Sequence, residues 1–213
     1  MRRLLLIVLT CLAVAAPAAP AHTADADLAK VGKGDLLTLD EAATVYDGLL
    51  KKSFRDTYRF GLGVPEFSAS PLVCDETRYE KGVSNVVGSY YPVQGPYFSL
   101  DETIVELRSG AAARALVQHY RDYARVCRGT HPTTDGEGGA AQQRVRAWQP
   151  KEVGAERAGV LEAFVQGGRT GWFRTLVTRV GRTVVVLQSE VGRGLPSARE
   201  LTAATRLAVE KLA

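Results

Sequence analysis

A helical repeat of apolar residues runs through the stretch SGAAARALVQHYRDYARVC, residues 109–127. Leu116 and Tyr123 fall on one face of such a helix, and charged residues occupy most of the other face. Ser109 is a favourable N-cap residue, because its hydroxyl can accept a hydrogen bond from the first turn. Cys127 ends the apolar face. The pattern therefore predicts an amphipathic helix that buries the thiol of its last residue.

Two further helices are predicted, one near each end of the chain. The stretch TLDEAATVYDGLL pairs Thr38 with Glu41 three residues later, and SARELTAATRLAVEKLA pairs Ser197 with Glu200 in the same way. This spacing is a capping box, in which the side chains of both residues bond backbone N–H groups at a helix start. The second stretch also carries an apolar stripe at helical spacing, which predicts that it packs on the fold.

Strand-like segments fill most of the remaining chain. Four of them follow one another through short Gly turns, namely QQRVRAWQ, GVLEAFVQ, GWFRTLVTRV and RTVVVLQSEV. Short turns between strands predict an antiparallel meander. SNVVGSYY and DETIVELRS are earlier strand candidates, and RGTHPTTDGEGGA is predicted to be a loop. This order predicts an α+β fold, with helices packed on one face of a central antiparallel sheet of about four to five strands.

The N-terminus has the pattern of a secretory signal peptide. Two arginines precede a short apolar run, and Ala-Pro-Ala then places the expected cleavage after Ala21. The alternatives are a lipoprotein cysteine at Cys11 and an uncleaved anchor. Residues 22–36 are predicted to be a flexible leader and residues 37–213 a single domain. We expect a secreted, extracellular protein with no transmembrane segment in the mature chain.

Charge and cysteine content narrow the class of protein. The full chain has a formal net charge of +4, and cleavage after Ala21 removes two arginines and leaves +2, so nucleic acid is not an expected partner. Cys74 and Cys127 remain in the mature chain. Two cysteines in an exported protein most simply pair with each other. A free thiol and a metal site are the alternatives for these cysteines.

No set of residues suggests catalysis. The histidines of the mature chain, His22, His119 and His131, are scattered, and no GxSxG motif occurs. Asp135 and Glu137 lack the carboxylate spacing of a calcium loop. We therefore predict no catalytic residue, no cofactor and no bound metal.

An aromatic segment and a row of arginines are the two candidate binding surfaces. SYYPVQGPYF contains Tyr90, Tyr91, Tyr97 and Phe98, and aromatic residues in such a segment either line an apolar cleft or cover the core edge. Trp148 completes the predicted ligand-binding set.

The arginines belong to the meander. Arg144 and Arg146 share one side of their strand with Trp148, whereas Arg174 and Arg179 point to opposite sides of theirs. Such a surface either meets an anionic partner or is an ordinary solvated sheet face.

The stretch TIVELRSGAAARALVQHYRDYARVC, the Gly-rich segment after it and the later TLVTRVGRTVVVLQSEV resemble the extracellular sensor domain of mycobacterial protein kinase H and its free-standing secreted relatives. The resemblance covers roughly residues 38–213. It implies a disulfide-braced α+β domain with a cleft for an unidentified ligand. The kinase domain has two disulfides, so only the bridge that involves Cys127 can be carried over.

We therefore predict a non-enzymatic module of the bacterial envelope that binds a small hydrophobic or amphipathic ligand or an envelope protein. A secreted envelope hydrolase and a structural or interaction protein of the cell surface are the alternatives. The hydrolase would need His119 or His131 within hydrogen-bond reach of a Ser, Asp or Glu in a pocket.

Overall fold

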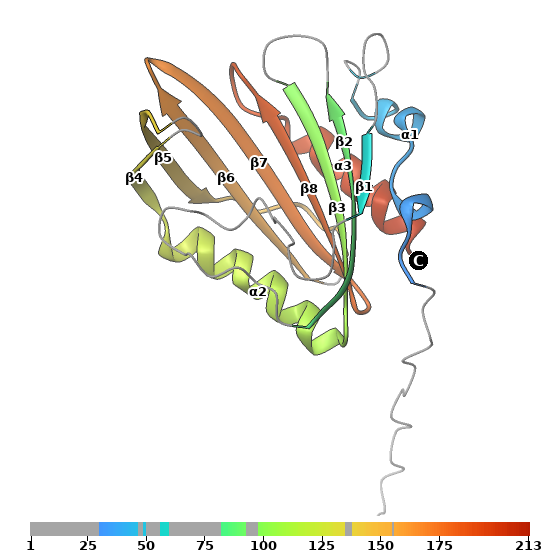
Figure 1. Cartoon of the computed structure of the whole chain (residues 1–213). Coiled ribbons are helices and arrows are strands. Elements are labelled where there is room, and N and C mark those ends of the chain that lie inside the picture. The colour runs from blue at the N-terminus through green and yellow to red at the C-terminus, as the bar shows by residue number, and fades with distance from the viewer. Residues whose placement is uncertain are drawn as a thin grey trace, which may run out of the picture.

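An antiparallel sheet with helices on both sides forms the described part of the protein (Figure 1). The computed structural model describes residues 30–46, 49, 56–59, 82–92, 98–134, 138–154 and 156–213. The elements are η1 (Lys33–Asp35), α1 (Leu39–Ala43), β1 (Asp56–Arg59), β2 (Val83–Pro92), β3 (Phe98–Leu107), α2 (Gly110–Val126), β4 (Gly129–Thr134), β5 (Ala140–Ala147), β6 (Arg157–Gln166), β7 (Arg169–Val180), β8 (Thr183–Val191) and α3 (Ala198–Lys211).

The sheet contains the predicted meander and extends beyond it. Its strand order is β1-β2-β3-β8-β7-β6-β5-β4, and all neighbouring strands are antiparallel. The four meander strands are β5 to β8, so the α+β class and the meander are confirmed. The expected count of about four to five strands is wrong, because β2 and β3 join the sheet along β8 and the short strands β1 and β4 form its edges.

Helices cover both faces of the sheet, so the prediction of a single helical face is also wrong. Val184 and Val186 of β8 pack in one core with α2, whereas Val185 and Leu187 pack in a second core with α3 and α1. A strand that is buried on both faces has a continuous apolar run instead of an alternating pattern. The run TVVVLQ in β8 has this property. We call the two sides of the sheet the α2 face and the α3 face.

The predicted loop after α2 forms edge strand β4 instead. Gly129 to Thr134 pair with β5, and none of these six residues is buried. An exposed edge strand needs no apolar side, and Pro132 is tolerated there because only one flank of the strand has to donate hydrogen bonds. Because these residues have no apolar pattern, the strand could not be predicted from them.

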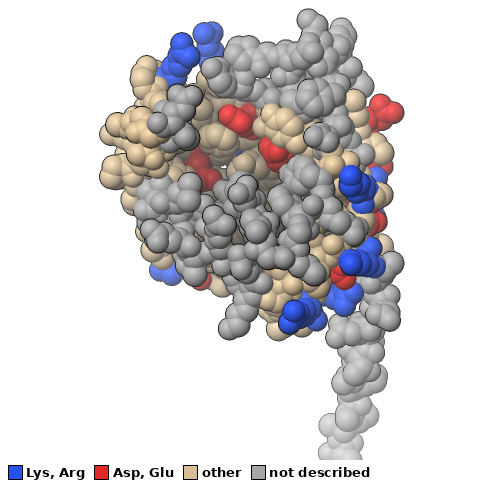
Figure 2. Space-filling view, in the orientation of Figure 1, with Lys and Arg blue, Asp and Glu red and all other residues tan. Residues whose placement is uncertain are grey.

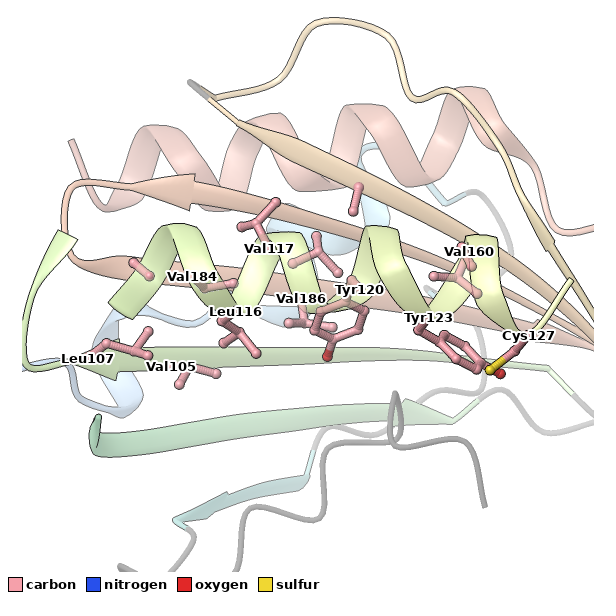
Figure 3. Close-up of a cluster of buried hydrophobic side chains, with 14 of the residues drawn as sticks. Val105, Leu107, Leu116, Val117, Tyr120, Tyr123, Cys127, Val160, Val184 and Val186 are labelled. Carbon is pink, nitrogen blue, oxygen red and sulfur yellow. The ribbon is translucent and has the colours of Figure 1, made fainter. Parts of the chain in front are cut away.

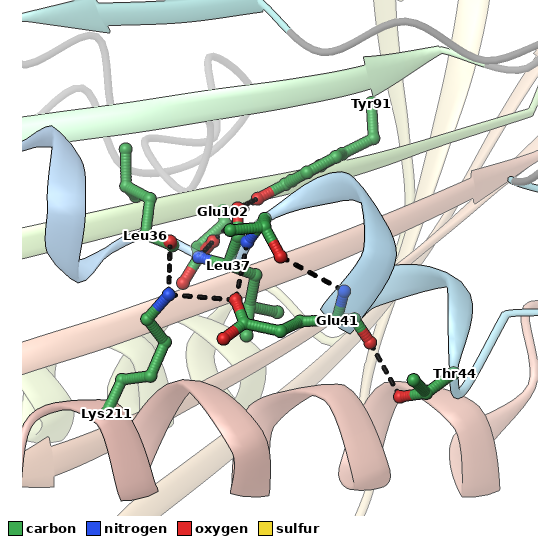
Figure 4. Close-up of polar contacts among 8 residues, drawn as sticks. Leu36, Leu37, Glu41, Thr44, Tyr91, Glu102 and Lys211 are labelled. Carbon is green, nitrogen blue, oxygen red and sulfur yellow. Dashed lines mark hydrogen bonds and ion pairs between the residues drawn. The ribbon is translucent and has the colours of Figure 1, made fainter.

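The folded part begins earlier than predicted. Val31 and Leu36, which belong to the predicted flexible leader, are only 4% and 1% exposed. Lys211 at the end of α3 donates hydrogen bonds to the Leu36 carbonyl oxygen (3.0 Å) and to the Glu41 carboxylate (2.8 Å; Figure 4). Contact with the C-terminal helix therefore orders the end of this segment.

A buried carboxylate fastens the same segment to the sheet. Glu102 of β3 accepts a hydrogen bond from the Leu37 N–H at 2.8 Å. The Tyr91 hydroxyl lies 2.9 Å from the same carboxylate oxygen and 2.6 Å from the Leu37 carbonyl oxygen (Figure 4). The predicted signal peptide lies outside the described residues. Among the described helices, none is both long and apolar enough to cross a membrane.

Candidate ligand-binding site

The predicted aromatic residues do not form one surface. Tyr90 and Tyr91 are consecutive in β2 and therefore point to opposite faces of the sheet. Tyr91 is fully buried on the α3 face, where its hydroxyl serves the network around Glu102, while Tyr90 is 37% exposed. Tyr97 and the side chain of Phe98 lie outside the described residues.

Trp148 lies on the α3 face, where it is half-buried against the same core as Tyr91. Its indole N–H donates a hydrogen bond to the Thr175 carbonyl oxygen at 3.0 Å. The predicted ligand-binding set is thus divided between the two faces, and Tyr91 is a core residue.

The thiol position at the end of α2 is buried as predicted. Cys127 is 0% exposed. Cys74 lies outside the described residues, so the Cys74–Cys127 pairing stays a prediction.

The inner side of α2 packs on an apolar part of the sheet and reaches a polar part at its C-terminal end. Leu116 and Val117 lie among valines of β3 and β8, and Tyr120 and Tyr123 follow along the same side of the helix (Figure 3). Apolar side chains line this face as far as Val160 of β6. Beyond Val160, the strand positions that face inward on this side of the sheet are occupied by polar residues.

We call these inward-facing residues the polar row. They lie on β3, β8, β7 and β6 of the α2 face, as the strand register shows: Ser99, Asp101, Glu162, Thr175, Gln188 and Glu190. Four of the six are buried, namely Ser99, Glu162, Thr175 and Gln188.

Hydrogen bonds connect five of the six members of the polar row to one another. The Ser99 hydroxyl lies 3.1 Å from the Asp101 carboxyl and 3.5 Å from the Glu190 carboxyl, and its single proton can serve only one of them at a time. Gln188 donates to the Thr175 hydroxyl at 2.9 Å. Two carboxyl groups thus share one serine as their described partner, and each keeps accepting capacity for other donors.

Glu162 is the most deeply buried carboxyl group of the polar row. One of its oxygens accepts hydrogen bonds from the Tyr123 hydroxyl and from the Gln143 amide, both at 2.6 Å. The hydroxyl of Tyr120, one helical turn before Tyr123, is buried and has no hydrogen-bond partner among the described residues. An unpaired buried hydroxyl is costly, so this group is available to an added acceptor.

Burial sets the protonation of these carboxyl groups. It raises the pKa of Asp101 to about 6, with the Glu190 charge adding to the rise and the Ser99 hydrogen bond opposing it. Burial also raises the pKa of Glu190 and of Glu162, against the hydrogen bonds that each accepts. The polar row therefore takes up protons more readily than exposed carboxylates do.

The surface of this face is hollowed near its centre. In the space-filling view, acidic side chains gather around the hollow, whereas lysines and arginines lie towards the outline of the molecule (Figure 2). Tyr90 and Phe173 point to the same face, beside Asp101 and Glu190 in the strand register. The arrangement offers hydrogen-bond acceptors next to aromatic surface.

The described histidines do not belong to the polar row. The His131 ring bonds the Cys127 carbonyl oxygen at 2.8 Å, and His119 lies edge-on to Tyr120 on α2. The described residues contain no group of three or more potential metal ligands. Asp135 and Glu137 lie outside them.

The fold is an α+β domain with an antiparallel sheet between helices. The chain is similar in structure to the extracellular domain of PknH from Mycobacterium tuberculosis, with a TM-score of 0.61 and 14% sequence identity, over 84% of this chain and 94% of that one. The resemblance expected from the sequence is therefore confirmed at the level of the fold.

A second solved structure is less similar to this chain. An uncharacterised protein from Mycobacterium smegmatis matches 81% of this chain and 96% of its own at 14% identity, but its TM-score of 0.41 carries no argument. No family model and no curated protein matches the sequence.

Sequence reasoning missed the polar row. A signal for it was present, because Asp101 and Glu102 are adjacent acidic residues in a β-rich segment and therefore point to opposite faces of one strand. In a strand buried on both sides, one carboxyl group must then enter each core. Recognising this required knowing that helices cover both faces.

Proposed function

We propose that this protein is an exported, non-enzymatic binding module of the sensor-domain type, and that its ligand occupies the hollow over the polar row. The observation that carries the proposal is the placement of polar side chains at inward-facing positions of central strands. The similarity of fold to an extracellular domain supports export, as do the signal peptide and the Cys74–Cys127 bridge that the sequence predicts.

The polar row lowers the stability of the fold. Burying a polar group that is incompletely hydrogen-bonded costs free energy, and apolar residues at these positions would extend the core that α2 already covers. Central strands normally supply such apolar residues. Buried acceptors beside a hollow are instead characteristic of a ligand site, where a few polar groups orient the ligand.

The chemistry of the hollow suggests the kind of ligand. Asp101, Glu190 and Glu162 accept hydrogen bonds, and Tyr90 and Phe173 offer aromatic surface on the same face. A small amphipathic molecule with hydrogen-bond donors at one end and an apolar portion at the other fits this arrangement. The polar end would donate hydrogen bonds to Asp101 and Glu190, for which Ser99 has only one hydroxyl proton.

Binding can be tested with simple amphipathic probes. We would titrate the protein with medium-chain alkyl amines, amides and alcohols and follow binding by ligand-observed NMR. The Glu190→Gln variant should weaken the tightest binder about tenfold, because a hydrogen bond to a charged group contributes about 1.5–3 kcal/mol. Glu210→Gln, an exposed site on α3, is the matched control and should bind like the parent protein. Equal binding by all three proteins, or none by any of them, would argue against the hollow as the site.

Export and the disulfide can be tested by the mass of the secreted protein. We expect a chain that begins at His22 and has no free thiol until it is reduced. A retained N-terminus or two free thiols would contradict this part of the proposal.

A further inference from the structure

The α3 face carries a second cluster of polar side chains, which lies on the meander strands. Arg146 of β5 and Arg174 of β7 are in one cross-strand row, with Leu161 of β6 between them. The Arg174 guanidinium lies 4.9 Å from the ring centroid of Trp148, and the Arg146 guanidinium lies 5.8 Å from that of Trp172. We call these four residues, Arg146, Trp148, Trp172 and Arg174, the arginine–tryptophan ladder.

The ladder is held in a defined position. A Cβ at Gly159 would lie 2.5 Å from the Trp148 carbonyl oxygen and 2.8 Å from its ring, so Trp148 requires glycine at this position. The Trp148 indole is also fixed by its hydrogen bond to Thr175. Stacking on the indole in turn limits the rotamers of Arg174. Such order differs from that of arginines on an ordinary solvated surface.

The ladder arginines have no acidic partner among the residues that the structure describes. Two other arginines, at the end of β7 and in the turn after it, have acidic partners, since Arg182 lies 2.6 Å from Glu106 and Arg179 lies 3.4 Å from Glu156. No described carboxylate pairs with Arg146 or Arg174. The Arg174 Nε is buried and has no hydrogen-bond partner in the described part of the chain.

The two guanidinium groups are close enough to repel each other. Burial lowers the pKa of Arg174, and the neighbouring Arg146 charge lowers it further. An anion between the two groups would remove this repulsion and supply acceptors for their N–H groups.

We propose that the arginine–tryptophan ladder binds a phosphate group through Arg146 and Arg174. A phosphomonoester carries a charge of about −1.5 to −2 at neutral pH, which matches the two guanidinium groups. Its oxygens can accept hydrogen bonds from two planar guanidinium groups at once. Arg binds phosphate more strongly than Lys in this bidentate geometry. Leu161 and Ala163 of β6, which are buried between the two arginine strands, form an apolar floor below the ligand.

This site is separate from the hollow. Arg174 and Thr175 are consecutive in β7 and point to opposite faces of the sheet, so phosphate binding does not depend on a ligand over the polar row. The phosphate can belong to a soluble molecule or to a lipid headgroup, and the experiment distinguishes these sources.

Tryptophan fluorescence reports on this site alone, because Trp148 and Trp172 are the two tryptophans of the chain. We would titrate the full chain with inorganic phosphate and with glycerol phosphate at constant ionic strength, using chloride as the reference. Calorimetry on the same samples detects binding without a spectral change. Vesicles of phosphatidylcholine with and without phosphatidic acid, which carries a phosphomonoester, form the membrane arm.

The variants decide the outcome. We expect a saturable response that Arg146→Gln and Arg174→Gln each weaken about tenfold or more, as the loss of a charge-assisted hydrogen bond predicts. Arg114→Gln, an exposed site on α2, should leave the response unchanged. Arg146→Gln keeps the test valid if Arg174→Gln fails to fold, because Arg146 is exposed.

The titrations with soluble phosphates and with vesicles distinguish the two possible sources of the phosphate group. A response to the soluble phosphates supports a soluble ligand, and a response only to phosphatidic acid vesicles supports a lipid headgroup, provided that the variants weaken it. No binding in either arm, or binding that both arginine variants retain, overturns the proposal.

Discussion

Two consecutive residues of β7 show how differently the two faces of the sheet are built. The Thr175 side chain meets Gln188 in the polar row, whereas Arg174 stacks on Trp148 on the other side. Acidic groups with raised pKa values gather on the first face, and guanidinium groups without a described carboxylate partner lie on the second. Because alternate residues of a strand face opposite sides, the two faces acquire independent chemistry from one set of strands.

The two faces also have one feature in common, which bears on the stability of the fold. Each face has an apolar region beneath a helix and a polar region beyond it. The helix-covered regions should therefore respond to truncation in similar ways, and the polar regions should not.

The largest effect is expected in the apolar cores. Leu116 of α2 and Leu201 of α3 are 1% and 0% exposed on opposite faces. Replacing either by Ala should lower the free energy of unfolding by about 3 kcal/mol, because each leaves a cavity in a packed core. Chemical denaturation measures both. A cost below about 1 kcal/mol at either site would mean that this helix is not packed as described.

A smaller loss is expected from crowding the α3 face. Gly159→Ala should lower the free energy of unfolding by about 2 kcal/mol, because the added methyl group displaces Trp148. The matched control is Gly171→Ala in β7, where the nearest contact of a new Cβ is 3.8 Å, to Phe173. Tryptophan fluorescence should shift in the first variant and not in the second. Equal effects would contradict the close seating of Trp148.

The raised pKa of Asp101 predicts that this residue destabilises the folded protein at neutral pH and not in acid. Its pKa is raised from 3.8 to about 6, so its protonated form favours folding below pH 3.8 and this contribution is lost as the pH rises through 6. Asp101→Asn should therefore be more stable than the parent at pH 7, by about 2 kcal/mol, and similar to it at pH 4. Denaturation at both pH values tests this.

Glu102, the residue next to Asp101, is expected to respond to substitution in the opposite direction. Glu102 on the α3 face accepts hydrogen bonds from the Leu37 N–H and the Tyr91 hydroxyl, so Glu102→Gln should lower stability at pH 7 by about 1 kcal/mol or more. If both variants changed stability in the same direction, the assignment of the two carboxyl groups to different environments would be wrong.

Local patterns in the sequence predicted the helices and the meander. The N-caps at Ser109, Thr38 and Ser197 are present, with each side chain accepting the expected backbone hydrogen bond. The apolar face of α2 is buried as its spacing indicates. Such features depend on residues close together in the chain, and local chemistry is sufficient to predict them.

The binding surfaces depended on information that is not local. Tyr90 and Tyr91 were grouped because they are adjacent, yet strand geometry separates them. Asp101 and Glu190 are brought together by the pairing of β3 with β8, which joins residues far apart in the sequence. The same holds for Arg146 and Arg174, which share a row only through β6. Strand register therefore decides both sites.

The central claim is that the polar row serves a ligand and not the fold, and the pair Gln188 and Thr175 tests it most directly. Both residues are buried, and each is the other's partner at 2.9 Å. The double variant Gln188→Leu with Thr175→Val replaces both partners by apolar groups of similar shape, a change that is nearly neutral or stabilising when a pair has no structural role. Chemical denaturation at pH 7 should give a free energy of unfolding equal to or above that of the parent. A loss of about 2 kcal/mol or more would show that the polar row holds the fold together, and would contradict the account.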